Sequence, residues 1–308
     1  MPADIGLATI VTEAFVDEFE LLKYSFELFH GTEWRWFVRC DRASLPALST
    51  HSNVHCTVFV ERHAERLDLL SAPFQRVMAE KMNVMQDAWA GIEQCRGVLF
   101  CDADLVFTAS LLPTLRDMAG EVILVPNYYP EGREHLVEHH GEFNGGFVFT
   151  RSPAFHEWWR EAYRRDSSRY NEQGCLNEAH ERFSIARLGP QANIGYWRTL
   201  NMPEYDTIPA DCTFLHAHLY GPLITLRHWL DRSFALHCVR FLMTSSVPEH
   251  RLLLERILSG DRHGWFEASL RVRGEWPAEG GSAPSIAQRA NDQRIVTDTA
   301  QQAASVGR

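Results

Sequence analysis

The feature that most constrains the fold is a short apolar run over residues 97–101, Gly-Val-Leu-Phe-Cys, which leads directly into Asp102-Ala103-Asp104. A continuous apolar run of this length, bounded by glycine, is typical of a strand that is buried on both faces, as in a parallel sheet. Parallel sheets of α/β proteins bind ligands at the carboxyl ends of their strands. The run therefore predicts an α/β fold with both aspartates at a ligand-binding edge.

The two carboxylates of Asp102 and Asp104 have two interpretations. Carboxylates this close repel each other unless a cation lies between them. A hard divalent ion such as Mg²⁺ or Mn²⁺ commonly binds carboxylates together with substrate phosphates. The alternative is that both are turn or N-cap residues before the helix expected after Ser110. The triplet alone does not decide between these interpretations.

Strand and helix patterns alternate along the chain up to about residue 125. This alternation is typical of βαβ units and a parallel sheet with helices on both faces. The predicted strands cover residues 5–11, 34–38, 54–60, 97–101 and 122–125, and the predicted helices cover 15–29, 73–95 and a segment after Ser110. The pattern then changes, and we expect a mixed part with strands at 143–150, 184–188, 193–197 and 212–218 and helices after Pro153 and over 173–182, 222–243 and 248–258.

The chain has 308 residues, of which 45% are hydrophobic, and this suffices for one large α/β domain or two modest ones. No apolar run is long enough to cross a bilayer, a signal peptide is not evident, and the seven cysteines are scattered without Cys-x-x-Cys pairs. We therefore expect a cytoplasmic protein. The net charge of −10 disfavours nucleic acid as a partner, because binding to its phosphates needs a basic surface.

Two further pairs of side chains could take part in a site at this edge. His216 and His218 alternate on a predicted strand and so share a face, where one imidazole could complete a metal site. The alternative is a pair of buried, hydrogen-bonded histidines. Arg76 and Lys81 lie on the helix before the Asp102 strand, where they could meet a phosphate, although most charged helical residues are solvated.

Two polar motifs follow in the second half of the chain. Asn144-Gly145-Gly146 allows close approach of the backbone to a sugar or phosphate, or else forms a β-bulge. Glu172-Gln173 could hydrogen-bond a polyol, although a glutamate at the start of a helix is also a routine partner of the helix dipole. The dinucleotide fingerprint, the Walker loop and the Gly-x-Ser-x-Gly elbow are absent from the sequence, which disfavours oxidoreductases, NTPases and serine hydrolases.

In their order along the chain, these motifs resemble those of GT-A-fold glycosyltransferases that use nucleotide sugars. The sequence most resembles two groups within this fold. One is the retaining enzymes of the glycogenin and lipopolysaccharide galactosyltransferase type, and the other is the nucleotide-diphospho-sugar transferases. The resemblance covers roughly residues 5–225, and the order of the motifs is more specific than any one of them. The motifs are Thr12-Glu13, Arg76 with Lys81, residues 99–104, residues 143–147, Glu172-Gln173-x-x-Leu176-Asn177 and His218-Leu-Tyr-Gly221.

The resemblance implies a metal-dependent enzyme that transfers a sugar from a UDP-sugar to an acceptor hydroxyl with retention of anomeric configuration. It implies Mn²⁺ or Mg²⁺ bound by Asp102, Asp104 and His218, with His216 as the alternate ligand. It also implies a role in catalysis for Gln173, Glu172 and Asn144. The contacts that it implies with the donor are Thr9, Val11, Thr12, Arg76, Lys81, Asp102, Ala103, Gly145 and Gly221.

The sequence departs from the family pattern at two places. The family often continues His-x-x-Gly with x-x-Lys-Pro-Trp, and this lysine contacts the diphosphate. Here residues 222–227 read Pro-Leu-Ile-Thr-Leu-Arg, so the lysine is missing. Arg227 is a cation, but its spacing from Gly221 differs from that of the family's lysine. Glu172 stands where the family has aspartate. Two other functions therefore stay open, a metal-dependent nucleotidyltransferase or sugar-nucleotide hydrolase, and a non-catalytic domain that binds nucleotide sugars.

The expected organisation is one GT-A domain over residues 1–273, with a nucleotide-binding half at 1–125 and an acceptor-side half at 126–273. Residues 274–308 are rich in small and polar residues, and we expect a disordered tail there. The expected partners are a nucleotide sugar and an acceptor that the sequence does not identify. The oligomeric state is not predicted either.

Overall fold

The structure is a computed structural model that describes residues 4–61, 72–129, 132, 135–165, 172–199, 208–220 and 229–276. Contacts between residues divide the chain into two units, Met1–Gly260 and Asp261–Arg308. The first unit holds every described strand. In the second, the described residues form helix α11, Trp265–Val272, and the Asp261 carboxylate accepts a hydrogen bond of 2.7 Å from the Phe266 N–H in its first turn. The expected domain end at residue 273 and the expected tail stay predictions, since residues 277–308 lie outside the described part.

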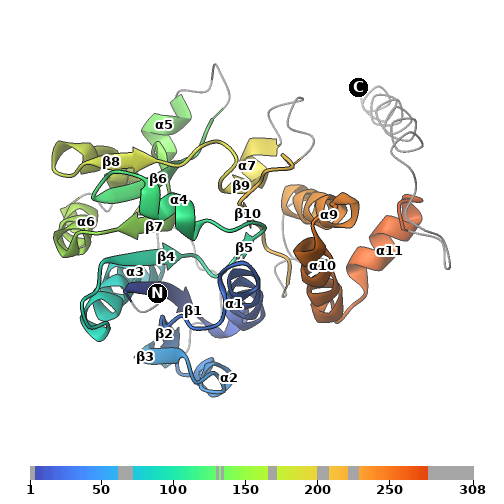
Figure 1. Ribbon diagram of the computed structural model, residues 1–308, viewed down its shortest axis with the longest axis horizontal. Coiled ribbons are helices and arrows are strands. Elements are labelled where there is room, and N and C mark those ends of the chain that lie inside the picture. Colours follow the sequence, from blue (N-terminus) through green and yellow to red (C-terminus); the bar gives the residue numbers. More distant parts are fainter. Residues whose placement is uncertain are drawn as a thin grey trace. The chain divides into compact units, whose positions relative to one another are not determined.

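A seven-stranded sheet forms the centre of the first unit, with strand order β3-β2-β1-β4-β7-β6-β8. Figure 1 shows these strands from β3 at the bottom to β8 at the top. Every pair is parallel except the two that involve β7, which is antiparallel to β4 and to β6. The strands are β1 Ile5–Val11, β2 Trp36–Asp41, β3 Val54–Val60, β4 Gly97–Cys101, β6 Val122–Pro126, β7 Phe143–Thr150 and β8 Ile185–Arg187.

Alternation of side chains along the strands builds an apolar core on each face of this sheet. On one face, Leu7 and Leu99 pack with Phe19 and Phe26 of α1, Val16–His30, and with α4, Leu112–Asp117. On the other face, Phe100 packs against α3, Ala72–Gly91, and α6, Pro153–Arg165. Figure 1 shows α3 and α6 to the left of the sheet and α1 to its right. The predicted α/β fold with helices on both faces is confirmed.

The antiparallel β7 determines what meets at the functional edge. The first five predicted strands all run in one direction, so their carboxyl ends share an edge. Because β7 runs the other way, its first residues, 143–146, lie at that same edge. A small second sheet, β5-β10-β9, begins there, with β5 Leu105–Phe107, β10 Phe214–His216 and β9 Ile194–Gly195.

Several predicted elements differ in kind or length from those observed. The predicted helix at 173–182 is a 3-10 helix, Gly174–Glu181, and the predicted strand at 193–197 is only two residues long, because helix α7 begins at Tyr196. The 212–218 strand is shorter than predicted, and the start of the 222–243 helix lies outside the described residues. The other elements are η1 Glu13–Phe15, α2 Leu45–Leu48, α5 His135–His140, α7 Tyr196–Thr199, α9 Trp229–Thr244 and α10 Pro248–Gly260.

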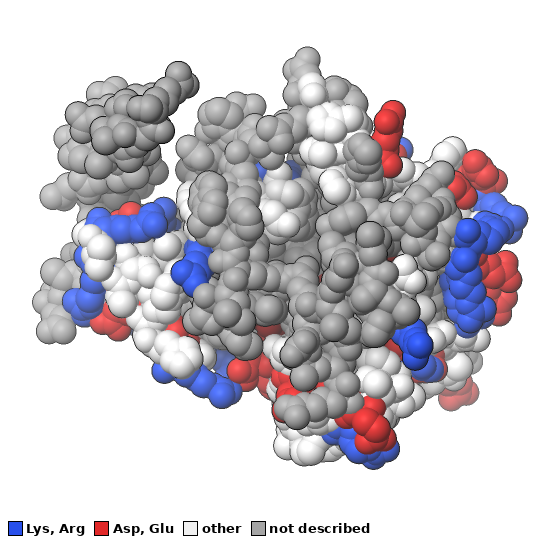
Figure 2. Space-filling model, turned by 180° about the vertical axis from the view of Figure 1, so that it is seen from behind, with Lys and Arg blue, Asp and Glu red and all other residues white. Residues whose placement is uncertain are grey.

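The charged surface is mixed in sign. Figure 2 shows acidic and basic side chains interspersed over the described residues of one face. Exposed ion pairs such as Arg251–Glu255 and Arg42–Glu61 contribute little to stability, because solvent screens them. In the described part of the chain, none of the helices combines the length and the apolar character that crossing a membrane requires.

His30 joins the end of α1 to the start of α4. Its Nδ1–H donates to the Phe26 carbonyl at 2.8 Å, and its Nε2 accepts from the Leu111 N–H at 2.9 Å, so the ring must be neutral. It stacks on the Phe26 ring with centroids 4.3 Å apart. Burial lowers the pKa of His30 to about 4, despite the Phe26 carbonyl.

This shift predicts a pH-dependent stability. Between pH 6.5 and 4, the unfolded chain protonates His30 while the folded chain does not, so the free energy of unfolding falls as pH falls. The contribution of His30 at pH 5 should be a loss of about 2 kcal/mol relative to pH 7. Urea unfolding at pH 7 and at pH 5 measures this effect. Between the two pH values, the free energy of unfolding of His30→Gln should fall by about 2 kcal/mol less than that of wild type. Equal losses would contradict the assignment.

Candidate functional site

The Asp102-Ala103-Asp104 turn connects β4 of the large sheet to β5 of the small sheet, and backbone hydrogen bonds hold it on both sides. The Asp102 N–H donates to the Gly146 carbonyl of β7 at 2.7 Å, and the Leu105 N–H closes the turn onto the Asp102 carbonyl at 3.2 Å. The Asp104 carbonyl accepts from the Ala217 N–H at 3.0 Å. The two aspartates are therefore fixed between strands, and neither precedes a helix as a cap.

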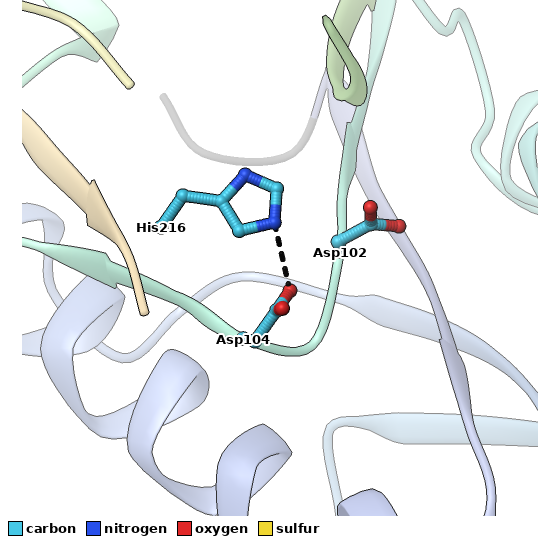
Figure 3. Close-up of side chains that lie close together, drawn as sticks. All are labelled: Asp102, Asp104 and His216. Carbon is cyan, nitrogen blue, oxygen red and sulfur yellow. Dashed lines mark ion pairs between the residues drawn. The ribbon is translucent and has the colours of Figure 1, made fainter. Parts of the chain in front are cut away.

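Asp104 lies between the two histidines that the sequence singles out. Its Oδ1 is 3.2 Å from His216 Nε2, and its Oδ2 is 3.1 Å from His218 Nε2. Register explains the first contact, because His216 of β10 lies opposite Leu105 of β5, directly after Asp104. In Figure 3 the Asp104 carboxylate points to the His216 ring, and the dashed line marks their ion pair.

Asp102 is paired with a buried lysine. Lys81 Nζ lies 2.9 Å from Asp102 Oδ1 and 2.5 Å from Glu172 Oε1, and it donates to the Gly145 carbonyl at 3.2 Å. The lysine comes from α3 and is 3% exposed. The backbone of Glu172 is held in turn, since its carbonyl accepts from Trp159 Nε1 of α6 at 2.9 Å. Helices from one face of the sheet thus bring a cation and a third carboxylate to the edge.

The electrostatics of these groups are strongly coupled. Burial raises the pKa of Asp102, and Lys81 only partly offsets this effect. Burial also acts to raise the pKa of Asp104, but His216 and His218 outweigh it and hold that pKa below its usual range. Asp104 in turn raises the pKa of His216 in spite of burial, and Asp102 with Glu172 raises that of Lys81. Opposite charges therefore alternate through the site.

This arrangement offers a metal ion three ligands. One atom each of Asp102, Asp104 and His216 lies within 4.8 Å of the other two. His218 contacts Asp104 but does not belong to that group of three. The absent side chain of Gly146 leaves space beside them, because a Cβ there would lie 2.6 Å from Asp102 Oδ2 and 2.8 Å from His216 Cε1.

A buried carboxylate oxygen points to a ligand beside Lys81. Glu172 is 3% exposed, and its Oε1 binds Lys81. Its Oε2 is buried without a hydrogen-bond partner among the described residues. Burying a carboxylate oxygen without a partner is costly. An oxygen of this kind at a ligand edge can accept a hydrogen bond from a bound hydroxyl.

The predicted amide groups lie next to these carboxylates. Gln173 Oε1 accepts from the Gly145 N–H at 3.4 Å, and its Nε2 donates to the His140 carbonyl at 2.6 Å. Asn144 Oδ1 accepts from the Gly146 N–H at 2.9 Å. The structure thus brings Asn144 and Gly145 of β7, together with Gln173 just before the 3-10 helix Gly174–Glu181, to the edge that holds Asp102 and Lys81.

The other predicted donor contacts are more scattered. Thr9 and Thr12 lie at the carboxyl end of β1, and both hydroxyl oxygens are buried without a hydrogen-bond partner among the described residues. Val11 and Ala103 belong to the apolar core beneath α1. Arg76 is exposed on α3 and is not among the described residues that contact Asp102. Gly221 and Arg227 lie outside the described part of the chain.

Sequence reasoning missed two buried residues of the site. Glu18, in the first turn of α1, is 2% exposed and accepts from the Tyr220 and Leu219 N–H groups at 2.9 and 3.4 Å, so it holds the segment after His218. Burial raises the pKa of Glu18 well above its ordinary value. Asn193 contacts His216. A glutamate in a first turn and an asparagine in a loop are common, so neither gave a signal.

Comparisons with known proteins support the fold. No family model matches the chain, and no curated protein matches it. Among solved structures, the galactosyltransferase LgtC in complex with donor and acceptor sugar analogues aligns at 15% identity and a TM-score of 0.51, over 81% of this chain and 100% of that one. The glycosyltransferase GlyE of Streptococcus pneumoniae TIGR4 aligns at 12% identity and a TM-score of 0.49, over 90% of this chain and 66% of that one. The alignment with LgtC shows that the chain has a GT-A-like glycosyltransferase fold.

Removing the shared cation should destabilise the protein. Lys81→Met should lower the free energy of unfolding by about 3–5 kcal/mol, because it leaves the buried carboxylates of Asp102 and Glu172 without a counter-charge. Arg76→Met removes an exposed cation from the same helix and should change it by less than about 0.5 kcal/mol. Urea unfolding at pH 7 with a chelator present measures both. Similar small losses for the two variants would contradict the role of Lys81.

Proposed function

We propose that the protein is a metal-dependent glycosyltransferase that moves a sugar from a UDP-sugar to an acceptor hydroxyl with retention of anomeric configuration. One observation carries this proposal: Asp102, Asp104 and His216 converge at the carboxyl edge of the sheet in a GT-A-like fold. The similar structure of LgtC was solved with donor and acceptor sugar analogues, which supports the same class of substrates here.

The residues present fit a divalent ion. Two carboxylates and one imidazole provide both oxygen and nitrogen ligands. This mixed set suits Mn²⁺ better than it suits Mg²⁺, which prefers oxygen ligands alone. The space beside Gly146 lies against Asp102 and His216. An ion held by Asp102, Asp104 and His216, or by His218 in its place, would supply positive charge to the donor diphosphate as a Lewis acid.

Lys81 supplies the fixed positive charge of the chain itself. Its ammonium is buried and already oriented by two carboxylates and a carbonyl, so no reorganisation is needed when negative charge develops on the departing diphosphate. Lys81 therefore offsets the absence of the family's lysine after Gly221. Arg76, on the same helix, would contact the diphosphate from the solvent side.

Glu172 and the two amides would bind the transferred sugar. The unpartnered Oε2 of Glu172 would accept a hydrogen bond from a sugar hydroxyl. Gln173 is oriented by its two backbone partners, and an amide is a poor nucleophile, so we assign it to stabilising the positive charge of the sugar. The bond from the sugar to the diphosphate would then break as the acceptor oxygen bonds to the same face of the sugar, and the proton of the acceptor hydroxyl would pass to the departing diphosphate oxygen, without a covalent intermediate. Asn144 and Gly145 would complete the sugar pocket.

The nucleoside would lie at the end of β1. The hydroxyls of Thr9 and Thr12 would bind the uridine, since neither has a hydrogen-bond partner among the described residues. Val11 would border it, and Ala103 would contact the donor through its backbone, because its side chain is in the core. In this proposal, residues 1–125 form the nucleotide-binding half and residues 126–273 form the acceptor-side half. Gly221, which lies outside the described residues, would contact the diphosphate. The protein would act in the cytoplasm.

Asp104→Asn tests this function. The variant should lose the stabilisation that wild type gains from a UDP-sugar together with Mn²⁺ in a thermal shift screen, because the charge and one ligand are removed. Asp117→Asn, an exposed aspartate of α4, should behave as wild type. Full transfer by Asp104→Asn without metal would contradict the proposal. Rapid donor breakdown without an acceptor would instead indicate a hydrolase, and donor binding without any product a binding domain.

The two adjacent glycines should separate metal binding from sugar binding. A Cβ at Gly146 would collide with Asp102 and His216, whereas a Cβ at Gly145 would lie 2.7 Å from Glu172 Oε1 and 3.2 Å from Gln173 Cβ. Gly146→Ala should weaken Mn²⁺ binding by at least about 10-fold, as displaced metal ligands do. Gly145→Ala should keep Mn²⁺ binding and weaken donor binding. Calorimetry with Mn²⁺ alone and then with the donor measures both, and the reverse pattern would contradict the assignment.

A further inference from the structure

The segment over residues 190–198 is built around the side chain of His216. The Nδ1–H of His216 donates to Asn193 Oδ1 at 3.1 Å. The ring of Trp197 lies edge-on to the imidazole, with centroids 5.1 Å apart and an interplanar angle of 84°. β9 pairs with β10 in parallel, with Gly195 opposite His216. One short segment therefore contacts the imidazole through a hydrogen bond, a ring and a strand.

The backbone of this segment is held in an unusual conformation. Asn193 has φ +57°, in the left-handed region that asparagine tolerates better than most residues. The buried Arg198 guanidinium donates to the carbonyls of Ala192 and Asn193 at 2.7 and 3.4 Å and lies over the Tyr128 ring at 4.9 Å. These contacts fix the turn that aims Asn193 Oδ1 at His216.

Gly195 serves the same arrangement. A Cβ at this position would lie 2.3 Å from the Trp197 ring. Only a residue without a side chain lets the indole fold back over β9 and reach His216. The amide of Asn193 contributes only its oxygen, since Nδ2 has no hydrogen-bond partner among the described residues. The side-chain oxygen of Asn193, which accepts the Nδ1–H of His216, is thus the part of this residue that acts on the imidazole.

We propose that Asn193 is a positioning residue that fixes the tautomer of His216 and thereby makes His216 the imidazole ligand of the metal. The inference rests on the proposed function. With its Nδ1–H donated to Asn193, His216 turns Nε2 toward the carboxylates of Asp102 and Asp104, so Nε2 is the ring atom that would ligate an ion bound between them. Hydrogen-bond acceptors on the other ring nitrogen orient metal-bound histidines in this way, and their loss weakens metal binding about 10–100-fold. His216 thus takes the role that the family resemblance assigns to His218.

Two substitutions at residue 193 isolate the acceptor. Asn193→Gly keeps the left-handed backbone and removes the acceptor, so Mn²⁺ binding should weaken about 10–100-fold. Asn193→Asp keeps an acceptor and should bind Mn²⁺ within about 3-fold of wild type, because the oxygen suffices. Calorimetry with Mn²⁺ alone, without donor, measures both. Urea unfolding without metal shows whether each variant is folded.

A spectroscopic readout tells the two histidines apart. Mn²⁺ bound to wild type should show the ¹⁴N hyperfine coupling of an imidazole, and this coupling should persist in His218→Gln and disappear in His216→Gln. Wild-type affinity in a folded Asn193→Gly, or a coupling that disappears only in His218→Gln, would overturn this inference and leave the proposed function standing. If wild type itself binds no Mn²⁺ with or without a UDP-sugar, the proposed function falls and this inference falls with it.

Discussion

The buried negative charge of Asp102 and Asp104 is the constraint on which the rest of the site depends. Two carboxylates one residue apart at a sheet edge are tolerated only with compensating charge nearby. The fold provides it from opposite sides, since Lys81 of α3 binds Asp102 and the two histidines around β10 bind Asp104. The same two carboxylates could bind a divalent ion, because the oxygens that accept hydrogen bonds from Lys81 and the imidazoles can also act as metal ligands.

The strand topology explains how distant segments meet at this pair. The parallel strands place the end of β4 at the ligand edge, and the antiparallel β7 brings Gly145 and Gly146 back to it. The small sheet then carries the chain from Asp104 into β5 and places His216 opposite it. Lys81 comes from α3, which packs against Phe100 on the face of the sheet opposite α1, and its ammonium lies 5.2 Å from the Phe100 ring. Glu172 lies between α6 and the following 3-10 helix and is held by Trp159 of α6. Charge and packing are therefore built by the same elements.

Local patterns predicted the parts of the fold that depend on neighbours in sequence. Spacing along the sequence was enough to recognise three features. These are the apolar run at 97–101 with its two aspartates, the alternation of strands and helices, and Lys81 on the preceding helix. The antiparallel direction of β7 was not predicted, because side-chain alternation is the same in either direction. Glu18 and Asn193 were missed because their partners are distant in sequence: Glu18 binds the backbone of Tyr220, 202 residues away. Which histidine faces both aspartates depends on strand register, which a His-x-His spacing leaves open.

Anomalous diffraction at the manganese edge from crystals soaked with Mn²⁺ and a UDP-sugar tests the central claim most directly. The account predicts one anomalous peak at the sheet edge, within bonding distance of an oxygen of Asp102, an oxygen of Asp104 and Nε2 of His216, with the donor diphosphate on its open side. A donor bound at this edge with no peak there, or with the ion held away from Asp102 and Asp104, would contradict it.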